Sequence, residues 1–176
     1  MKLLLLSANT TKYPYPVYPL GLDYIAGALT PRHEVRILDM HVVGGVEHLA
    51  DAIRDFDPDC IGLSIRNIDN VDTLASKSFV QGYERIIRFI RGCKKVPVVI
   101  GGSGFSIFPG ELMALLEADF GVVGEGEFLG LLLDVLEKGT VVADLPGIIR
   151  RGGNIREPVP WTGAVKRQFL PGDTAL

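Results

Sequence analysis

The chain has 176 residues, of which 47% are hydrophobic and 22% charged, with two cysteines and a net charge of -3. This length is close to the roughly 150 residues of one domain, and such a chain can bury a core without a disulfide or metal staple. The slightly acidic balance argues against a nucleic-acid-binding protein that relies on phosphate contacts.

The first elements are an apolar strand, a proline-rich loop and a helix. Leu3 to Ser7 is apolar almost throughout, which predicts a strand covered on both faces, and it is too short for a signal peptide. Prolines exclude a helix from Ala8 to Pro19. Helical spacing then predicts a helix over Leu20 to Leu29, and alternation predicts a strand near a sheet edge over Glu34 to Leu38.

Two helices and a third strand follow. Val46 to Phe56 carries apolar residues at helical spacing, and Cys60 to Ser64 is an apolar strand. An amphipathic stripe predicts a helix from Leu74 to Arg91, with Asp72 or Thr73 as its N-cap.

The apolar run that ends at Ile100 predicts the central strand of the sheet. Val96 to Ile100 contains no polar residue and stops abruptly in glycines and serines. Pro109 suits the first turn of a helix through Leu116. Phe120 to Val123 predicts a fifth strand, and Phe128 to Lys138 a helix closed by Gly139.

The end of the chain is predicted to form a small hairpin followed by a linker or arm without regular structure. Ile148 to Arg151 and Ile155 to Arg156 flank the turn residues Gly152 to Asn154. No periodicity follows Glu157. We therefore expect a domain over residues 1–156 and a linker or arm over residues 157–176.

Alternating strands and helices of this kind predict an α/β fold with a doubly wound, five-stranded parallel sheet. Right-handed crossovers favour the strand order 2-1-3-4-5, as in flavodoxin-like proteins. Cys60 and Cys93 look like small buried hydrophobes of a reducing compartment, without zinc or iron–sulfur spacing. No run is long enough to span a membrane, and we expect a cytoplasmic protein.

The loops after strands one, three, four and five should meet at one edge of the sheet, where such folds bind ligands. Small, polar and glycine residues in all four loops predict a broad, shallow site for a large ligand. Each loop also has an ordinary explanation, because Asn and Ser cap helices and Gly makes turns. The candidate site residues are Asn9, Thr10, Thr11, Ser64, Ile65, Arg66, Asn67, Gly101, Gly102, Ser103, Gly104, Phe105, Gly124, Glu125, Gly126 and Glu127.

Several standard sites are absent from these loops. The glycine run after the fourth strand lacks the lysine of a Walker loop, and no dinucleotide-binding glycine motif follows the first strand. The first loop also lacks the acidic residues of a phospho-acceptor receiver domain. No nucleophile elbow is present, and Gly102 to Gly104 has no evident His and acid partners.

Five short motifs in order resemble those of one known family. The chain resembles the N-terminal cobalamin-binding domain of cobalamin-dependent radical S-adenosylmethionine enzymes over about residues 1 to 156. Each motif is weak alone, but the ordered set is fairly specific. The motifs are Tyr18 to Leu22, His33 to Asp39, Ile61 to Asn67, Val99 to Gly102 and Val123 to Glu127.

The resemblance implies a corrin ring on the rim, which is the edge of the sheet where these four loops meet, with its nucleotide tail beside the central strand. Gly101 and Gly102 would then clear room for the tail, and Ser64 would hydrogen-bond the dimethylbenzimidazole base or a nearby group. Backbone amides around Ser103 to Phe105 would meet polar atoms of the tail, and Asn9 to Thr11 would meet the corrin. The carboxylates after the fifth strand, on Glu125 and Glu127, could bond corrin amides or simply cap the following helix.

One further motif, Asp39 to Gly44, matches the Asp-x-His-x-x-Gly pattern that places a histidine under cobalt in cobalamin mutases. In those proteins the motif follows the first strand, whereas here it follows the second, at the outer edge of the sheet. We therefore expect His41 not to ligate cobalt, and cobalamin to bind with its base detached. Arg66 could lie near the lower face, but a guanidinium has no lone pair for cobalt.

The cluster-binding Cys-x-x-x-Cys-x-x-Cys motif of the radical enzymes is absent. S-adenosylmethionine and a 4Fe-4S cluster are therefore expected only in a separate radical domain in cis, with an unidentified substrate. The fragment is expected to be non-catalytic alone, in a parent enzyme that transfers methyl groups or performs other radical chemistry. Two alternatives stay open: a free-standing corrinoid carrier, and a flavodoxin-like module in which Tyr13, Tyr15 and Tyr18 stack on a flavin or which binds only a partner protein.

Overall fold

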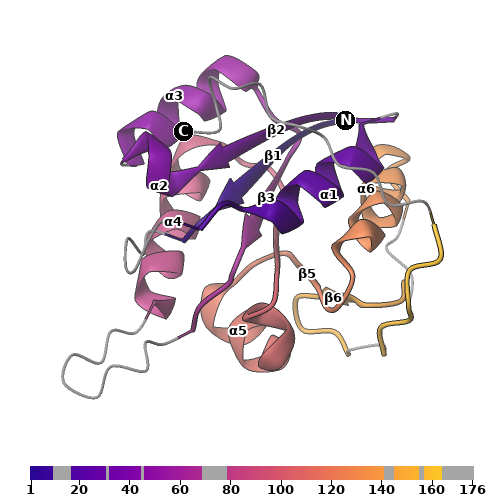
Figure 1. The fold of residues 1–176 in the computed structure, drawn as a ribbon. Coiled ribbons are helices and arrows are strands. Elements are labelled where there is room, and N and C mark those ends of the chain that lie inside the picture. The colour runs from indigo at the N-terminus through magenta and orange to yellow at the C-terminus, as the bar shows by residue number, and fades with distance from the viewer. Residues whose placement is uncertain are drawn as a thin grey trace.

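The computed structural model describes residues 1–9, 17–30, 32–44, 46–68, 79–140, 145–154 and 157–163. Within them one sheet is flanked by helices on both faces (Figure 1). The strands are β1 (Lys2–Ser7), β2 (Glu34–Asp39), β3 (Cys60–Ser64), β4 (Val98–Gly101), β5 (Phe120–Val122) and β6 (Ile148–Arg150).

The sheet has six strands in the order β2-β1-β3-β4-β5-β6. The first five are parallel in the predicted order, which confirms the doubly wound fold. The expected strand count of five is corrected, because β6 adds an antiparallel edge strand in which Ile148 pairs with Val122. The buried side chains of Ile148 and Ile149 explain why this segment joins the sheet. Its predicted hairpin partner, residues 155–156, lies outside the described residues.

Most helices begin and end close to their predicted bounds. They are α1 (Leu20–Leu29), α2 (Met40–Val43), α3 (Val46–Phe56), α4 (Val80–Cys93), α5 (Pro109–Leu116) and α6 (Leu129–Glu137), with the short 3₁₀ turns η1 (Phe105–Ile107) and η2 (Gly126–Phe128). The described part of α4 begins at Val80, and its predicted caps, Asp72 and Thr73, lie outside the described residues. The helix α2 was not predicted; the Asp39 carboxylate caps it by accepting the His41 N–H at 3.0 Å.

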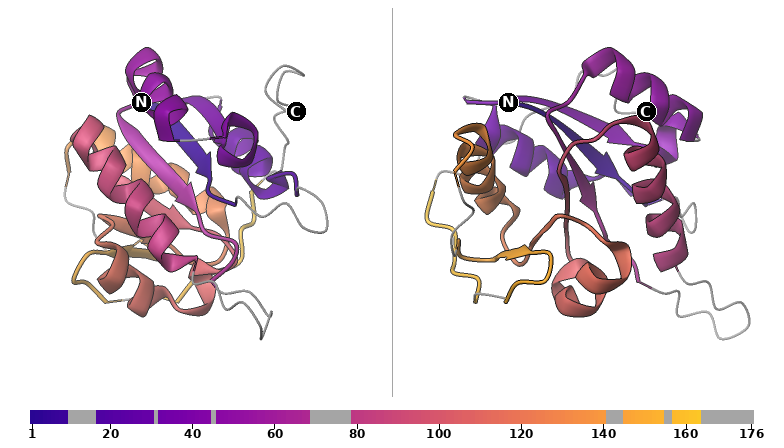
Figure 2. Two further views of the ribbon diagram at one scale, coloured as in Figure 1. Left: turned by 90° about the vertical axis from the view of Figure 1, so that its left-hand side faces the viewer. Right: turned by 180° about the vertical axis from the view of Figure 1, so that it is seen from behind.

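Alternation along the strands divides the core into two layers. Leu4, Ile61 and Ile100 face α3, α4 and α5, which follow one another along the face seen in the right-hand view of Figure 2. Leu3, Leu5 and Val99 face the opposite way, toward α1 and α6. Both faces of β1 and β4 are therefore covered, as their wholly apolar sequences predicted.

The two cysteines differ in environment, contrary to the expectation that both are buried. Cys60 is fully buried in β3, and this burial raises the pKa of its thiol to about 12. Cys93 is exposed, because it is the last residue of α4 and lies beyond Ile90, the last buried residue of that helix. Within the described ranges, every helix is too short or too polar to cross a membrane.

Candidate functional site

The strand register places small residues side by side where the parallel strands end. Ser7 lies opposite Ser64, Ser64 opposite Gly101, and Gly101 opposite Val122. One step deeper on the same face, Leu5 lies opposite Gly62, and Gly62 opposite Val99. The two central strands thus present Gly62, Ser64 and Gly101 on the α1 side. Because these residues are small, their side chains leave space above the sheet between α1 and the loops that follow β4 and β5.

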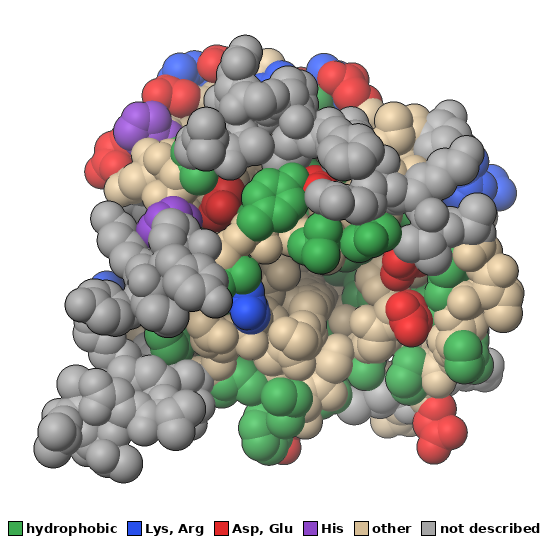
Figure 3. All heavy atoms as spheres, viewed as in Figure 1, with side chains coloured by type: hydrophobic (Ala, Val, Ile, Leu, Met, Phe, Trp, Pro, Cys, Tyr) green, Lys and Arg blue, Asp and Glu red, His purple; other side chains and the backbone are tan. Residues whose placement is uncertain are grey.

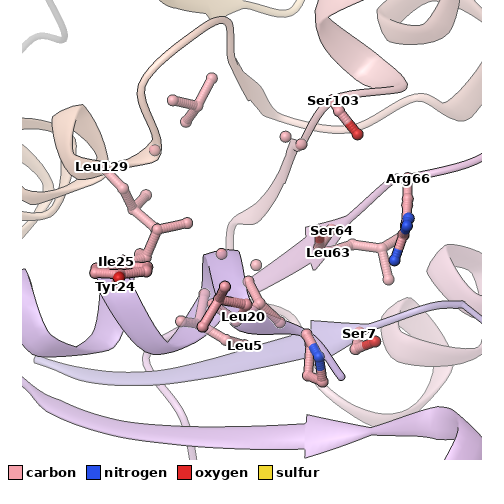
Figure 4. Close-up of a pocket in the computed structure, with 18 of the residues that line it drawn as sticks. Leu5, Ser7, Leu20, Tyr24, Ile25, Leu63, Ser64, Arg66, Ser103 and Leu129 are labelled. Carbon is pink, nitrogen blue, oxygen red and sulfur yellow. The ribbon is translucent and has the colours of Figure 1, made fainter. Parts of the chain in front are cut away.

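A pocket of about 1060 Å³ opens over these small residues. Its walls come from three sides: Tyr24 and Ile25 of α1 with Leu129 of α6, Leu5 and Ser7 of β1, and the ends of β3 and β4 (Figure 4). The space-filling view shows the molecule hollowed here, with mostly backbone or uncharged, non-hydrophobic side chains at the bottom of the hollow (Figure 3).

Ten of the sixteen predicted site residues line this pocket. Thr10 and Thr11 lie outside the described residues, and four others do not reach the pocket wall. The ten that line it come from all four predicted loops: Asn9, Ser64, Arg66, Gly101, Gly102, Ser103, Gly124, Glu125, Gly126 and Glu127.

The four predicted residues outside the pocket have other roles in the fold. Ile65 and Phe105 are fully buried in the core layer on the opposite face of the sheet. Gly104 donates its amide to the Ile65 carbonyl at 2.9 Å, so this amide is already used within the protein. Asn67 lies 3.4 Å from the Asn9 side-chain oxygen, and its carbonyl accepts the Tyr83 hydroxyl at 2.6 Å. These contacts hold the rim loops together.

The glycines after β4 serve backbone packing as well as access to the pocket. Gly102 has φ of +104°, and a Cβ there would lie 2.6 Å from the Ile65 carbonyl oxygen. A Cβ on Gly104 would lie 2.7 Å from the Arg66 carbonyl oxygen. Only glycine therefore lets the loop after β4 lie against the loop after β3. Gly101 differs, because its nearest neighbour, the Val122 carbonyl oxygen, would be 3.3 Å from a Cβ.

Sequence reasoning missed a hydroxyl that joins two of the site loops. The Ser106 hydroxyl accepts the Gly124 N–H at 3.0 Å and donates to the Gly102 carbonyl oxygen at 3.1 Å. Its position at the end of the glycine-rich loop was the available signal.

The α1 wall of the pocket was also missed. Tyr18, Leu20 and Tyr24 line the pocket, and the Tyr18 hydroxyl donates to the buried carboxylate of Asp23 at 2.6 Å. The signal for this wall was present in the motif from Tyr18 to Leu22. That motif had supported the family resemblance, and only its Tyr18 had been given a ligand contact, in the flavin-binding alternative.

Charges flank the pocket on opposite sides. Arg66 is exposed at the end of β3, while Glu125 is exposed and Glu127 half-buried in the loop after β5. Among the described residues, the N-cap positions of η2 and α6 make no side-chain hydrogen bond to their helices, and Glu127 lies in the first turn of η2. The pocket therefore has a cation and two carboxylates available for a ligand with many amide groups.

His41 does not lie in the pocket. It belongs to α2, which follows β2 at the edge of the sheet, and it is absent from the pocket lining. Its ring Nδ1 is buried without a hydrogen-bond partner in the described part of the chain. Among the described residues, no group of three or more His, Cys, Asp or Glu side chains could hold a metal ion.

Comparison with known proteins adds to this geometry. The family described as the B12 binding domain matches residues 6–131. A tryptophan 2-C-methyltransferase of Streptomyces laurentii is 33% identical over 160 residues, which are 86% of this chain and 27% of the relative. An uncharacterized methyltransferase of Pyrococcus horikoshii is 29% identical over 150 residues, or 81% of this chain and 30% of the relative.

Solved structures of radical S-adenosylmethionine enzymes share the fold. The methyltransferase TsrM from Kitasatospora setae, with tryptophan and an S-adenosylmethionine analogue bound, has a TM-score of 0.81 and 32% identity over 89% of this chain. A second TsrM structure, with cobalamin and a [4Fe-4S] cluster bound, has a TM-score of 0.77 and 30% identity over 94% of this chain. The cobalamin-dependent enzyme OxsB has a TM-score of 0.72 at 20% identity, which shows a common fold. This chain spans 30% and 31% of the two TsrM chains and 22% of the OxsB chain.

Proposed function

This chain belongs to the B12 binding domain family, and from that membership we propose that its cobalamin occupies the pocket at the carboxyl ends of β1, β3, β4 and β5. The observation that carries this proposal is the row of small residues in register. Ser64 and Gly101 are paired across β3 and β4 beneath a pocket of about 1060 Å³, just above the roughly 300–1,000 Å³ usual for ligand pockets.

The residues present fit the cofactor. A Cβ on Gly62 would meet Leu5, and one on Gly101 would approach the β5 backbone. Glycines at these positions therefore leave space for a ligand beside the central strands. The lining is apolar along the sheet and polar at the mouth, as a flat macrocycle with amide side chains and a buried tail requires.

The chain's own residues would hold the corrin from the rim. We assign hydrogen bonds to corrin or tail amides to the side chains of Asn9, Ser64 and Ser103 and to the carboxylates of Glu125 and Glu127, all of which line the pocket. When bound, the corrinoid supplies the organometallic chemistry, and the domain contributes position and surroundings.

The cofactor is proposed to bind with its base detached and no histidine on cobalt. The described pocket lining contains neither a histidine nor a cysteine, and Arg66 offers no lone pair. His41 lies on α2 at the sheet edge, outside this lining.

A longer parent protein is part of the proposal. TsrM is a radical S-adenosylmethionine methyltransferase, and this chain matches about a third or less of its length and of the length of the tryptophan 2-C-methyltransferase. We propose that a radical domain in cis binds S-adenosylmethionine and the 4Fe-4S cluster and carries out methyl transfer or related radical chemistry. The substrate is left unassigned, because the match to the tryptophan enzyme covers only 27% of that protein.

The connection to such a domain is proposed to run through residues 157–176. Of these, residues 157–163 are described, and Trp161 packs edge-on against Phe128 with ring centroids 5.3 Å apart. The first residues of the arm therefore pack on the domain next to η2.

A cytoplasmic location stays a prediction.

The test is to mix the purified chain with hydroxocobalamin, remove free cofactor by desalting, and record the visible spectrum. Retained colour with a base-off band is expected, and the same spectrum is expected for His41→Ala. A wild-type spectrum without the base-off band that changes to a base-off spectrum in His41→Ala would mean that histidine ligates cobalt, as in a corrinoid carrier. Retention of flavin mononucleotide in place of the corrinoid would favour the flavodoxin-like alternative.

A further inference from the structure

The pocket has two levels with different chemistry, and we infer that the deeper level selects corrinoids by their lower base, favouring an apolar benzimidazole over a purine. This inference rests on the proposed function, because it requires the nucleotide tail to enter beside the central strands. It concerns which corrinoids the domain accepts, a choice that binding to cobalamin alone leaves open.

The deeper level is formed by apolar side chains in register. Leu5, Gly62 and Val99 are neighbours across β1, β3 and β4, and all three line the pocket. Leu5 and Val99 are each 2% exposed. Ile25 and Leu129 form the walls at this level from α1 and α6 (Figure 4).

Hydrogen-bonding side chains lie one level higher, at the strand ends. The hydroxyls of Ser7 and Ser64 lie two residues further along β1 and β3, and Gly101, which has no side chain, is the matching position on β4. The backbone groups below them are engaged in the parallel pairing of β1, β3 and β4. A base that reaches the deeper level therefore meets methyl and methylene groups, with few polar groups on the sheet side.

Purine and benzimidazole bases differ at this point. Adenine carries an exocyclic amine and additional ring nitrogens, which are hydrogen-bonded in water and would lose partners against Leu5 and Val99. One buried polar group left unpaired costs about tenfold in affinity. The two methyl groups of dimethylbenzimidazole gain from the same burial. The apolar floor thus discriminates by penalising the more polar base.

Gly62 sets the depth available to the base. A Cβ at this position would lie 2.8 Å from the Cδ2 atom of Leu5. Because that atom is the end of a flexible side chain, an alanine can be accommodated when Leu5 moves, at the expense of space in the pocket. Gly62 and Val99 are therefore the two positions at which depth and polarity can be changed separately.

The experiment compares the dissociation constants of three corrinoids in their hydroxo forms. These are cobalamin, with dimethylbenzimidazole, pseudocobalamin, with adenine, and cobinamide, which has no nucleotide tail. The variants are Val99→Thr and Gly62→Ala. Gly82→Ala is the matched control, because Gly82 is an exposed position of α4 and a Cβ there would meet no atom of the described residues within 4 Å.

The two bases also hold cobalt with different strength, so the decisive number is the ratio of the pseudocobalamin and cobalamin dissociation constants in each variant. Val99→Thr should lower this ratio about fivefold or more relative to wild type, since a hydroxyl at the floor offers the purine a partner. Gly62→Ala should weaken cobalamin about tenfold while cobinamide binding stays unchanged. Gly82→Ala should match wild type for all three.

Failure of the inference differs from failure of the proposed function. A ratio unchanged by Val99→Thr, or equal weakening of cobalamin and cobinamide by Gly62→Ala, would overturn base selection while leaving corrinoid binding intact. Absence of binding by all three corrinoids to the wild-type chain would contradict the proposed pocket itself. If Gly62→Ala fails to fold, the Val99→Thr ratio decides alone.

Discussion

The hydroxyl of Ser106 accepts the backbone N–H of Gly124 at 3.0 Å, although the two residues lie in loops that follow different strands. The same hydroxyl donates to the Gly102 carbonyl at 3.1 Å. One side chain therefore fixes the spacing between the glycine loop after β4 and the acidic loop after β5. Both loops contribute residues to the proposed cobalamin pocket.

Replacing Ser106 by alanine should loosen the pocket without unfolding the domain. Two hydrogen bonds are lost, each contributing about 1 kcal/mol, and the Gly124 amide loses its partner. We expect hydroxocobalamin to bind about fivefold to tenfold more weakly. Hydrogen exchange of the Gly124 amide should become faster in the cofactor-free protein.

The Ser106→Thr variant is the control, because it keeps a hydroxyl at the same position. It should retain most of the affinity and of the Gly124 protection. Unchanged exchange at Gly124 in Ser106→Ala would show that this hydrogen bond does not set the loop spacing.

Gly102→Ala should destabilise the domain by about 2 kcal/mol or more. The residue has φ of +104°, and the new Cβ would lie 2.6 Å from the Ile65 carbonyl oxygen, a backbone atom that cannot move aside. Urea unfolding measures the change. Gly82→Ala, at an exposed position of α4, should instead stabilise the domain by about 0.5–1 kcal/mol. Equal effects of the two variants would mean that Gly102 is not conformationally required.

Asp119 joins three elements at the end of the sheet away from the pocket. Its carboxylate accepts the Val98 N–H at 2.8 Å and pairs with Arg91 at 3.1 Å and Arg151 at 3.3 Å. Asp119→Ala leaves the half-buried amide and two cations without this partner, and it should lower the free energy of unfolding by about 1–3 kcal/mol.

The matched control for Asp119 is Asp51→Ala. Asp51 pairs with Arg54 on the exposed side of α3, and its loss should cost less than about 0.5 kcal/mol. Chemical denaturation of both variants gives the comparison. A cost for Asp119→Ala as small as that for Asp51→Ala would remove the claim that Asp119 ties β4 to α4 and β6.

His33 should make the domain less stable in mild acid. Burial and the nearby Met1 ammonium lower the pKa of His33 below 6.5, although Asp134 and Glu137 act in the opposite direction. The unfolded chain therefore binds more protons than the folded chain as the pH falls below about 6.5. The free energy of unfolding should decrease on acidification through that window.

The effect is measured by urea unfolding at about pH 7.5 and about pH 5.5, which lie on either side of the unperturbed histidine pKa of about 6.5. His33→Gln should reduce the difference between the two pH values, because glutamine does not titrate. His48→Gln, on the exposed side of α3, should keep the wild-type difference. An unchanged difference in His33→Gln would assign the pH dependence to other groups.

The sequence predicted the parallel core well, because β1, β3 and β4 are apolar on both faces and separated by helices. The partner of Ile148 to Arg150 was not predictable, since a three-residue strand carries no signal for which edge it joins. The position of Ser106 at the end of the glycine-rich loop pointed toward the site, but its contact with Gly124 was not predictable. It depends on the packing of two loops 18 residues apart.

The glycines show how one pattern serves two purposes. Gly102 was predicted to clear room for the nucleotide tail, and Gly104 to lie where backbone amides meet it, whereas the structure shows that both also permit contact with the backbone of Ile65 and Arg66. Tyr24 was missed because its helix face becomes a pocket wall only when α1 is placed beside the ends of β3 and β4.

Equilibrium dialysis against hydroxocobalamin tests the location of the cofactor most directly. Ser64→Phe places a ring in the pocket, next to Gly101 on the neighbouring strand. Leu115→Phe instead enlarges a side chain that is 59% exposed on α5, away from the pocket. With both variants folded by circular dichroism, wild type and Leu115→Phe should bind alike, and Ser64→Phe should lose at least about tenfold in affinity. Wild-type affinity in Ser64→Phe would place the corrinoid elsewhere on the molecule and contradict the account.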